Sequence, residues 1–349
     1  MTSDLALQIL VLSLGVHVLS HILAPVNIRL SNKLGILAQP SERRIHTQMK
    51  PEAGGLSFAL PILLAQVILV IFFLPPQLGG MMLNLAGVEL LVLVFGVTDD
   101  RYESQVRYKL LWQIAVAVIM YLIGFKVNTL TNPLGHDFVL GWFSFPVTVI
   151  WYLVVLNAIN LIDGIDGLAS GICVIVCGIL LIVGIKEQNV LVTALSALLL
   201  AGNLAFLRFN FHPAKIFLGE TGAQFNGLVI AAIATAGTTQ YKGITSMTLI
   251  IPMSVLAIPV LDMVLAIFRR LRMGSIFAAD KAHLHHSMLA LGLSQQAISL
   301  IVYAVTLLFG LIAIGFSFSS KRVLFLLLLG LLILMVVAAY ILMRQEKKK

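Results

Sequence analysis

The sequence predicts an all-α, polytopic integral membrane protein with about eleven transmembrane helices. Two observations lead to this fold class. Of the 349 residues, 60% are hydrophobic and only 11% are charged, which leaves too few polar groups to cover a surface that faces water. Apolar runs of roughly 20 residues, the length that crosses a bilayer as a helix, recur from one end of the chain to the other. A soluble protein is excluded, and no room is left for a large domain outside the membrane.

The predicted spans are eleven apolar runs separated by polar breaks. In chain order they lie near 5–25, 55–74, 81–98, 110–125, 142–157, 169–185, 190–207, 223–238, 247–268, 297–317 and 323–343. The first run is interpreted as a retained span, because Asp4 stands where a signal peptide carries basic residues and no A-x-A-like cleavage site follows. We treat residues 1–349 as one integrated membrane domain.

The distribution of Lys and Arg predicts the orientation, because basic residues gather in cytoplasmic loops. Of the 23 Lys and Arg residues, 18 fall on the side of the membrane that holds the C-terminus. We therefore expect an external N-terminus and a cytoplasmic C-terminus. The net charge of +8 reflects this topology, and no nucleic-acid partner is expected.

All the polar motifs fall on the predicted cytoplasmic side. They occupy the loops 31–54, 99–109, 157–168, 208–222 and 269–296. A transporter would instead need polar groups at mid-membrane that can be reached from both sides. The pattern therefore favours an enzyme that works at the inner face of the membrane.

Asp99 and Asp100 stand together at the end of the third predicted span, ten residues before Lys109. Adjacent carboxylates either share a cation or shift one another's pKa, so the pair is a candidate metal or acid–base site. The alternative is a solvated loop that caps the following helix.

Polar side chains recur at steps of three in the loop after the fifth predicted span. With the glycines that follow the acids, they are Asn157, Asn160, Asp163, Gly164, Asp166 and Gly167. Steps of three make each side chain a neighbour of the next on a helical surface, and the glycines allow the chain to leave the helix and approach a ligand closely. A simple turn would not require four such groups.

Two later loops carry groups that suit an anionic ligand. Thr221 and Gly222, before the eighth predicted span, offer free backbone N–H groups to phosphate, although a plain capping turn fits equally well. His283, His285 and His286 lie in the longest cytoplasmic loop. No cysteine is available there to complete a zinc site, whereas imidazoles can donate hydrogen bonds to phosphate oxygens or hold a carboxylate in place.

The predicted topology brings acidic side chains from several loops to one side of the membrane. They are Asp99, Asp100, Asp163, Asp166 and Glu220. This set would repel a phosphorylated substrate unless a divalent cation intervened. Mg²⁺ is suited to this place, because it binds one or two carboxylates together with substrate phosphates. The reaction class that these residues indicate is phosphoryl transfer.

The motifs resemble those of the polyprenyl-phosphate N-acetylhexosamine-1-phosphate transferases, glycosyl transferase family 4. The resemblance rests on four elements in order: Pro40–Gly55, Asp99-Asp100 with Lys109, Asn157–Leu168, and Phe217–Gly222 followed by His283–His286. It implies transfer of a HexNAc-1-phosphate, with GlcNAc-1-phosphate the expected group, from a UDP-sugar to undecaprenyl phosphate, with release of UMP. It also implies Mg²⁺ or Mn²⁺ as cofactor, a bacterial cytoplasmic membrane, and a product that starts a cell-surface polysaccharide.

The resemblance implies roles for individual residues. It makes the catalytic set Asp99, Asp100, Lys109, His283, His285 and His286. It makes the substrate-binding set Asn160, Asp163, Asn210 and Phe217, with the last two at the uracil. It places the metal at Asp166 and Glu220.

Two places depart from the family pattern. Glu220 replaces the family's metal-binding aspartate and is followed by Ala223 in place of serine, and Ala38-Gln39 replaces a frequent Asp-Lys. One extra methylene moves a carboxylate by about 1.5 Å, which the octahedron of Mg²⁺ does not readily accept. Three outcomes for the activity therefore remain open: it is retained, it is shifted toward Mn²⁺, or it is lost. The sequence also leaves the oligomeric state open, with a homodimer as one alternative. The alternative function is a non-catalytic relative that binds or transports a lipid phosphate.

Overall fold

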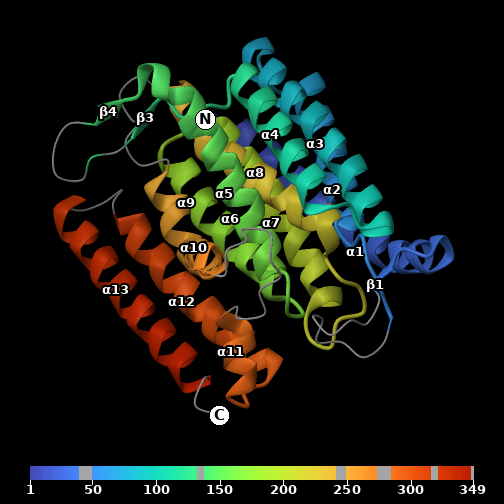
Figure 1. Cartoon of the computed structure of the whole chain (residues 1–349). Coiled ribbons are helices and arrows are strands. Elements are labelled where there is room, and N and C mark those ends of the chain that lie inside the picture. The colour runs from blue at the N-terminus through green and yellow to red at the C-terminus, as the bar shows by residue number, and fades with distance from the viewer. Residues whose placement is uncertain are drawn as a thin grey trace.

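The computed structural model describes residues 1–38, 49–130, 132, 137–240, 249–272, 284–315 and 321–346. Within these residues the chain folds into a bundle of helices, and most of the long ones run side by side (Figure 1). Six of the described helices are long and apolar enough to cross a membrane. The all-α, multi-pass membrane class predicted from composition is thus confirmed.

Each predicted apolar run contains a helix, in the predicted order, and α11 (Leu284–Ala290) is a further short helix in the predicted loop 269–296. The helices are α1 (Ser3–Leu34), α2 (Leu56–Phe72), α3 (Pro76–Tyr102), α4 (Val106–Leu122), α5 (Ser144–Ile162), α6 (Leu168–Lys186), α7 (Val190–Asn210), α8 (Gly219–Gln240), α9 (Ile250–Val255), α10 (Ala257–Arg272), α11 (Leu284–Ala290), α12 (Gln295–Gly315) and α13 (Lys321–Glu346), with the 3₁₀ helix η1 (Gly141–Phe143) before α5. There are also two short antiparallel strand pairs among the described residues. In one, β1 (Leu37–Ala38) pairs with β2 (Lys50–Pro51), and in the other, β3 (Thr129–Leu130) pairs with β4 (Phe138–Val139).

The ninth predicted span is divided into two helices, α9 and α10. Pro259 lies in the first turn of α10 and has no backbone N–H, so it cannot donate to the carbonyl of Val255, and a continuous α-helix is interrupted there. Figure 1 shows α10 nearly end-on beside helices that are seen from the side. The chain therefore changes direction at residue 256, which the apolar run did not indicate.

Helix α8 forms the centre of the bundle, where it packs against α3, α5 and α7. Its apolar side chains from Phe225 to Ala236 are buried. Polar pairs fix neighbouring helices within this apolar interior. Asn203 on α7 and Asn226 on α8 exchange two hydrogen bonds of 2.8 and 2.9 Å, which leaves neither amide unsatisfied in a place without water.

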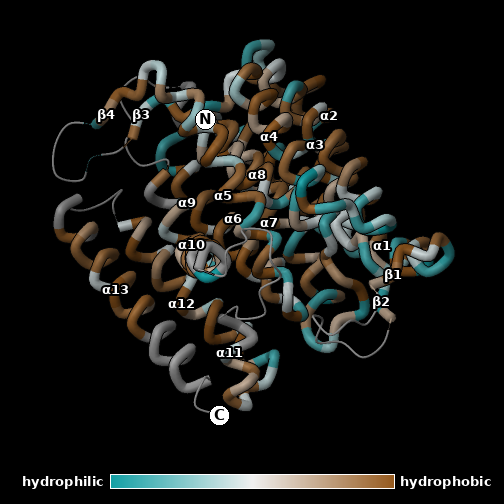
Figure 2. The backbone as a smooth tube through the Cα atoms, in the orientation of Figure 1, coloured by the Kyte–Doolittle hydropathy of each residue, from teal (hydrophilic) through white to brown (hydrophobic). Residues whose placement is uncertain are grey.

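Apolar residues make up most of each long helix, as the brown colour in Figure 2 shows, and many of them are exposed on the outside of the bundle. On α1 the side chains of Leu7, Leu10 and Leu14 are 56–60% exposed. An apolar surface of this extent is unusual for a soluble monomer, but it matches a bilayer, which surrounds the helices with hydrocarbon.

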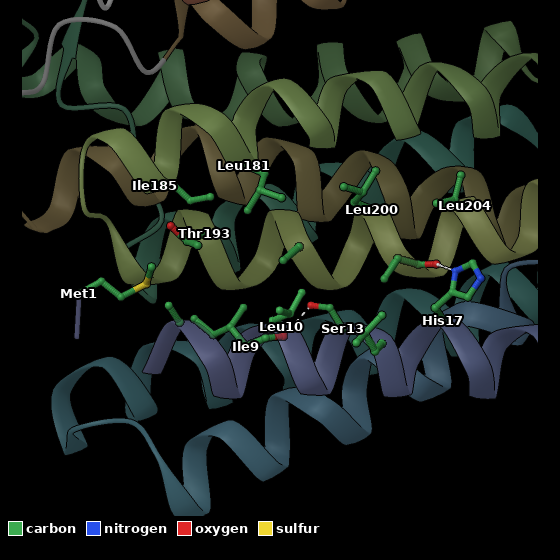
Figure 3. Close-up of a pocket in the computed structure, with 14 residues that line it drawn as sticks. Met1, Ile9, Leu10, Ser13, His17, Leu181, Ile185, Thr193, Leu200 and Leu204 are labelled. Carbon is green, nitrogen blue, oxygen red and sulfur yellow. Dashed lines mark hydrogen bonds between the residues drawn. The ribbon is translucent and has the colours of Figure 1, made fainter. Parts of the chain in front are cut away.

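An apolar groove of about 300 Å³ runs along the bundle between α1 and the paired helices α6 and α7 (Figure 3). Leu10 and Leu204 form parts of its walls, and His17 lies at one end. The Nδ1 atom of His17 is 3.2 Å from the carbonyl oxygen of Ala201, which satisfies this ring nitrogen. None of the residues that line the groove belongs to the predicted site.

The predicted site residues gather at one end of the bundle, here called the site end. The C-terminal ends of α3, α5 and α7 lie there with the N-terminal ends of α4, α6 and α8, and β2 closes it from the side. Backbone N–H groups of Phe217 and Gly54 donate to the carbonyls of Pro51 and Phe217 over 2.9 and 3.0 Å. These bonds hold β2 and the segment before α8 against each other.

Two glycines permit the close approach of α3 and α2 to the start of α8. A Cβ atom at Gly96 would lie 2.5 Å from the Cα of Thr221, and one at Gly55 would lie 2.3 Å from the backbone nitrogen of Gly222. Both distances are shorter than side chains tolerate, and both neighbours are backbone atoms that cannot rotate away. Small residues at these positions are therefore required for the site end to form.

Gly96→Ala should destabilise the protein by roughly 1–3 kcal/mol, the usual cost of overpacking, and should lower the melting temperature of the purified protein in detergent. Gly87→Ala is the matched control, because Gly87 lies on the same helix and a Cβ there would meet nothing within 4 Å. Alanine favours a helix over glycine, so this control should melt at the wild-type temperature or slightly above. Equal melting of both variants would contradict the close α3–α8 contact.

Candidate functional site

Asp99 and Asp100 lie in the last turn of α3 and are 4% and 8% exposed. The sequence suggested a loop at this point, but the helix continues to Tyr102. Asp99 receives a hydrogen bond of 2.9 Å from the backbone N–H of Ser104, and its other oxygen lies 2.9 Å from Nζ of Lys109. Each oxygen of Asp99 therefore has one partner, from the turn after α3 and from α4, and keeps room to accept a further hydrogen bond.

Asp100 points toward the first turn of α8. Its Oδ1 accepts the backbone N–H of Glu220 at 2.7 Å, and its Oδ2 accepts the backbone N–H of Thr221 at 3.1 Å and the Thr221 hydroxyl at 2.5 Å. The first N–H groups of a helix have no partner within the helix and carry partial positive charge. The carboxylate of Asp100 thus caps α8 from a neighbouring helix and occupies the N–H of Thr221, one of the two N–H groups that the sequence suggested for phosphate.

Glu220 is joined to both α3 and α4 through Lys109. Nζ of Lys109 lies 2.5 Å from Oε1 of Glu220, while Oε2 of Glu220 accepts a hydrogen bond of 3.0 Å from Gln224, one turn along α8. Both oxygens of this carboxylate are therefore engaged. The arrangement places the lysine between two carboxylates, those of Asp99 and Glu220.

A chain of side-chain amides continues this network to α5. Gln224 accepts a hydrogen bond of 3.2 Å from Gln113 on α4, and Gln113 in turn accepts one of 2.8 Å from Asn157 on α5. Gln113 and Gln224 are almost completely buried. Because Gln113 and Gln224 each donate and accept while Asn157 donates, the network links α4, α5 and α8 next to the acidic residues.

Asp163 follows the last residue of α5 and lies where several carboxylates meet. Burial and then the negative charges of Glu52, Asp100 and Glu220 raise the pKa of Asp163 well above its ordinary value, against a smaller opposite effect from a hydrogen bond with the backbone of Gly219. Four carboxylates from four parts of the chain are thus close enough to repel one another. Such a cluster favours the binding of positive charge.

Asp166 occupies the opposite end of the same loop. Its Oδ2 accepts the backbone N–H of Ala214 at 2.9 Å, lies 2.9 Å from Nδ1 of His212, and lies 3.7 Å from Nζ of Lys50. The three groups come from β2 and from the segment between α7 and α8. Asp166 therefore ties the loop after α5 to the segment that carries Phe217.

Phe217 and Asn210 lie at this junction but in different surroundings. Phe217 is half-buried, and Nζ of Lys50 lies 5.1 Å from the centre of its ring. Asn210 is 2% exposed, accepts a hydrogen bond of 2.8 Å from Ser170 and donates one of 3.0 Å to the carbonyl of Ile216. In this structure Asn210 holds the segment before α8 in place, while Phe217 is half-buried with the ammonium of Lys50 over its ring.

The loop between α5 and α6 is braced by α12. The hydroxyl of Tyr303 donates to the carbonyl of Gly167 over 2.5 Å, and Gly167 has a left-handed backbone with φ of 78°. Gly171, one turn into α6, leaves room for the tyrosine, because a Cβ there would lie 2.0 Å from its hydroxyl. This contact was not anticipated from the motifs, which do not extend to α12.

The structure describes only part of the surroundings of the remaining predicted residues. Asn160 lies in the last turn of α5 and is half-buried. His283 lies outside the described residues, and His285 and His286 belong to α11 with side chains outside the described part of the structure. The structure thus brings together Asp99, Asp100, Lys109, Asp163, Asp166, Phe217 and Glu220 at the site end.

Sequence reasoning missed four polar residues of this site. They are Lys50, Glu52, His212 and Gln224. Lys50 and Glu52 flank a proline just before Gly54-Gly55, and two opposite charges beside a glycine pair were a signal that could have been followed. Gln224 lies four residues after Glu220, a spacing at which side chains on a helix meet.

Comparison with known proteins agrees with these features. The sequence profile of glycosyl transferase family 4 matches residues 82–238. A probable undecaprenyl-phosphate N-acetylglucosaminyl 1-phosphate transferase of Bacillus subtilis is 36% identical over 295 residues, which cover 84% of this chain and 80% of the relative.

Two further relatives come from other bacteria. A decaprenyl-phosphate N-acetylglucosaminephosphotransferase of Mycobacterium tuberculosis is 33% identical over 82% of this chain and 76% of its own length. An undecaprenyl-phosphate alpha-N-acetylglucosaminyl 1-phosphate transferase of Escherichia coli is 32% identical over 80% of this chain and 76% of its own length. The chain therefore belongs to glycosyl transferase family 4, as its ordered motifs indicate.

Proposed function

We propose that this protein transfers GlcNAc-1-phosphate from UDP-GlcNAc to undecaprenyl phosphate and releases UMP. The observation that carries the proposal is the group of buried or half-buried carboxylates at the site end, with Lys109 held between Asp99 and Glu220. The names of three relatives support both the sugar phosphate and the polyprenyl acceptor. The product would begin a cell-surface polysaccharide.

In this reaction an oxygen of the lipid phosphate attacks the β-phosphorus of the UDP-sugar. A new oxygen–phosphorus bond forms, the bond from the β-phosphorus to the bridging oxygen breaks, and UMP leaves with the electron pair. Little covalent chemistry is required of the protein beyond positioning and charge stabilisation. We assign Asp99 to orient the lipid phosphate and accept its proton, and Lys109 to hold Asp99 in place across 2.9 Å.

The membrane topology forms part of the proposal. With eleven spans and an external N-terminus, the site end lies at the cytoplasmic face of a bacterial cytoplasmic membrane, where UDP-sugars are made. The basic residues near this end, including Lys50, Arg101, Arg107 and Arg208, support this orientation. The polyprenyl chain then remains in the bilayer while its phosphate reaches the carboxylates.

A divalent cation, Mg²⁺ or Mn²⁺, is also proposed. Among the described residues no three His, Cys, Asp or Glu side chains are grouped so that they could hold a metal ion by themselves. Mg²⁺ does not need such a group, because it commonly binds one or two carboxylates, substrate phosphates and water.

The resemblance implies Asp166 and Glu220 as ligands, but here Asp166 is held by Ala214, His212 and Lys50. We therefore assign the ion to Glu220 and Asp163, since repulsion among the acids at Asp163 would be relieved by added positive charge. Glu220 would exchange its contact with Lys109 or Gln224 for the ion. The cation would neutralise charge on the diphosphate.

Asp99→Asn should lower turnover at least roughly a hundredfold, because the amide cannot accept a proton. The fold should persist, since the amide oxygen can still accept the N–H of Ser104 and Lys109 still forms its ion pair with Glu220. Release of UMP from UDP-GlcNAc with undecaprenyl phosphate measures turnover, and the melting temperature monitors folding.

Asp4→Asn is the control for Asp99→Asn, because Asp4 is an exposed residue in the first turn of α1, far along the helix from the site end. It should leave turnover unchanged. The same assay decides between the enzyme and a non-catalytic lipid-phosphate-binding or transport protein. Absence of UMP release from the wild-type protein with any of a panel of UDP-sugars would support the latter.

Glu220→Asp should raise turnover with Mg²⁺ relative to Mn²⁺, because the shorter carboxylate withdraws from Lys109 and Gln224 and suits the stricter geometry of Mg²⁺. Glu220→Gln should abolish turnover with both ions. Activity over a titration of each ion gives the ratio, and Mn²⁺ binding followed by electron paramagnetic resonance reports the ion directly. Full activity of Glu220→Gln would show that this residue is not a metal ligand.

A further inference from the structure

The ammonium of Lys50 lies over the half-buried ring of Phe217. Its Nζ is 5.1 Å from the centre of the Phe217 ring and 3.7 Å from Oδ2 of Asp166. Lys50 is 24% exposed, whereas Asp166 is only 9% exposed. A cation over an aromatic face is attracted by the negative potential of the ring, so Lys50 rests where a planar ligand would stack.

The backbone of Lys50 is fixed although its head group is weakly held. Lys50 pairs with Ala38 in the β1–β2 ladder, and the next residue, Pro51, accepts the N–H of Phe217. At the other end of the side chain, the 3.7 Å to Asp166 exceeds hydrogen-bond length. The same carboxylate oxygen already has His212 and Ala214 at 2.9 Å. The ammonium can therefore leave without disturbing either backbone.

We propose that Lys50 leaves the Phe217 ring when a uridine nucleotide binds, and that it then pairs with the phosphates of that nucleotide. This inference rests on the proposed function and on the stacking of uracil on Phe217 that the family resemblance implies. The base takes the ring face that the ammonium covers, so the lost cation–π contact is exchanged for a charge-assisted hydrogen bond to phosphate, which is the stronger interaction. Lys50 thereby distinguishes a nucleotide from a nucleoside.

The charges around Lys50 favour this exchange. The acids Glu52, Asp100, Asp163 and Glu220 of the site end repel a diphosphate, and burial together with their mutual repulsion raises the pKa of Asp163. Lys109 is already placed between Asp99 and Glu220. Lys50, by contrast, has a carboxylate partner beyond hydrogen-bond distance, and Asp166 retains two partners after the lysine departs.

The test compares ligands that share the base and differ in phosphate. Binding of uridine, UMP and UDP-GlcNAc to the purified full-length protein is measured by calorimetry at fixed ionic strength and fixed Mg²⁺. Lys50→Met should weaken UMP and UDP-GlcNAc roughly tenfold or more, as expected for one charge-assisted hydrogen bond. Uridine should bind as well as to wild type or better, because the ring face is no longer covered. Lys50→Arg should restore much of the nucleotide affinity.

Lys33→Met is the matched control, since Lys33 is an exposed lysine in the last turn of α1 and its loss changes the net charge equally. It should leave all three affinities near wild type. Equal weakening of uridine and UDP-GlcNAc by Lys50→Met would mean that Lys50 only supports the ring, and unchanged affinities would exclude any role; either result overturns the inference. If wild type binds none of the three ligands, the proposed function itself fails, and the inference fails with it.

Discussion

The hydrogen bonds from the start of α8 to Asp100 are the interaction on which the site end depends. Two backbone N–H groups and the Thr221 hydroxyl converge on one carboxylate of α3. They give α8 an N-terminal cap that its own sequence does not supply, because the helix begins at a glycine with a left-handed φ of 72°. A Cβ at Gly219 would lie 2.7 Å from Oδ2 of Asp100, so this glycine is needed for the contact. The position of Glu220 follows directly from the cap.

The acids of the site differ in how fully their charge is balanced. Asp99 and Glu220 share Lys109, Asp100 is held by the start of α8, and Asp166 has His212, Ala214 and Lys50. Asp163, among the described residues, has a backbone hydrogen bond and three repelling carboxylates around it. The unbalanced negative charge is therefore concentrated at the loop between α5 and α6.

Apolar periodicity predicted the helices well, because each span must satisfy its own backbone within the membrane. The ends of the helices were predicted less well. Helix α3 includes Asp99 and Asp100, and α8 starts at Gly219 and not near Ala223, since each end is stabilised by the other across 120 residues of sequence. The motifs located most of the acids. They could not reveal that Lys50 meets Phe217 or that Tyr303 reaches Gly167, because these contacts join segments with no shared pattern.

The extra methylene of Glu220 has an effect in the structure that differs from the effect expected from the sequence. Judged against a metal octahedron, it misplaces a carboxylate by about 1.5 Å. In the structure it allows the carboxylate to reach Lys109 and Gln224 together. A cation that bound Glu220 would weaken its contact with Lys109, and the ammonium already has Asp99 at 2.9 Å as its second partner. Glu220 and Asp99 thus share one ammonium, so a change at the longer side chain also changes the charge that balances Asp99.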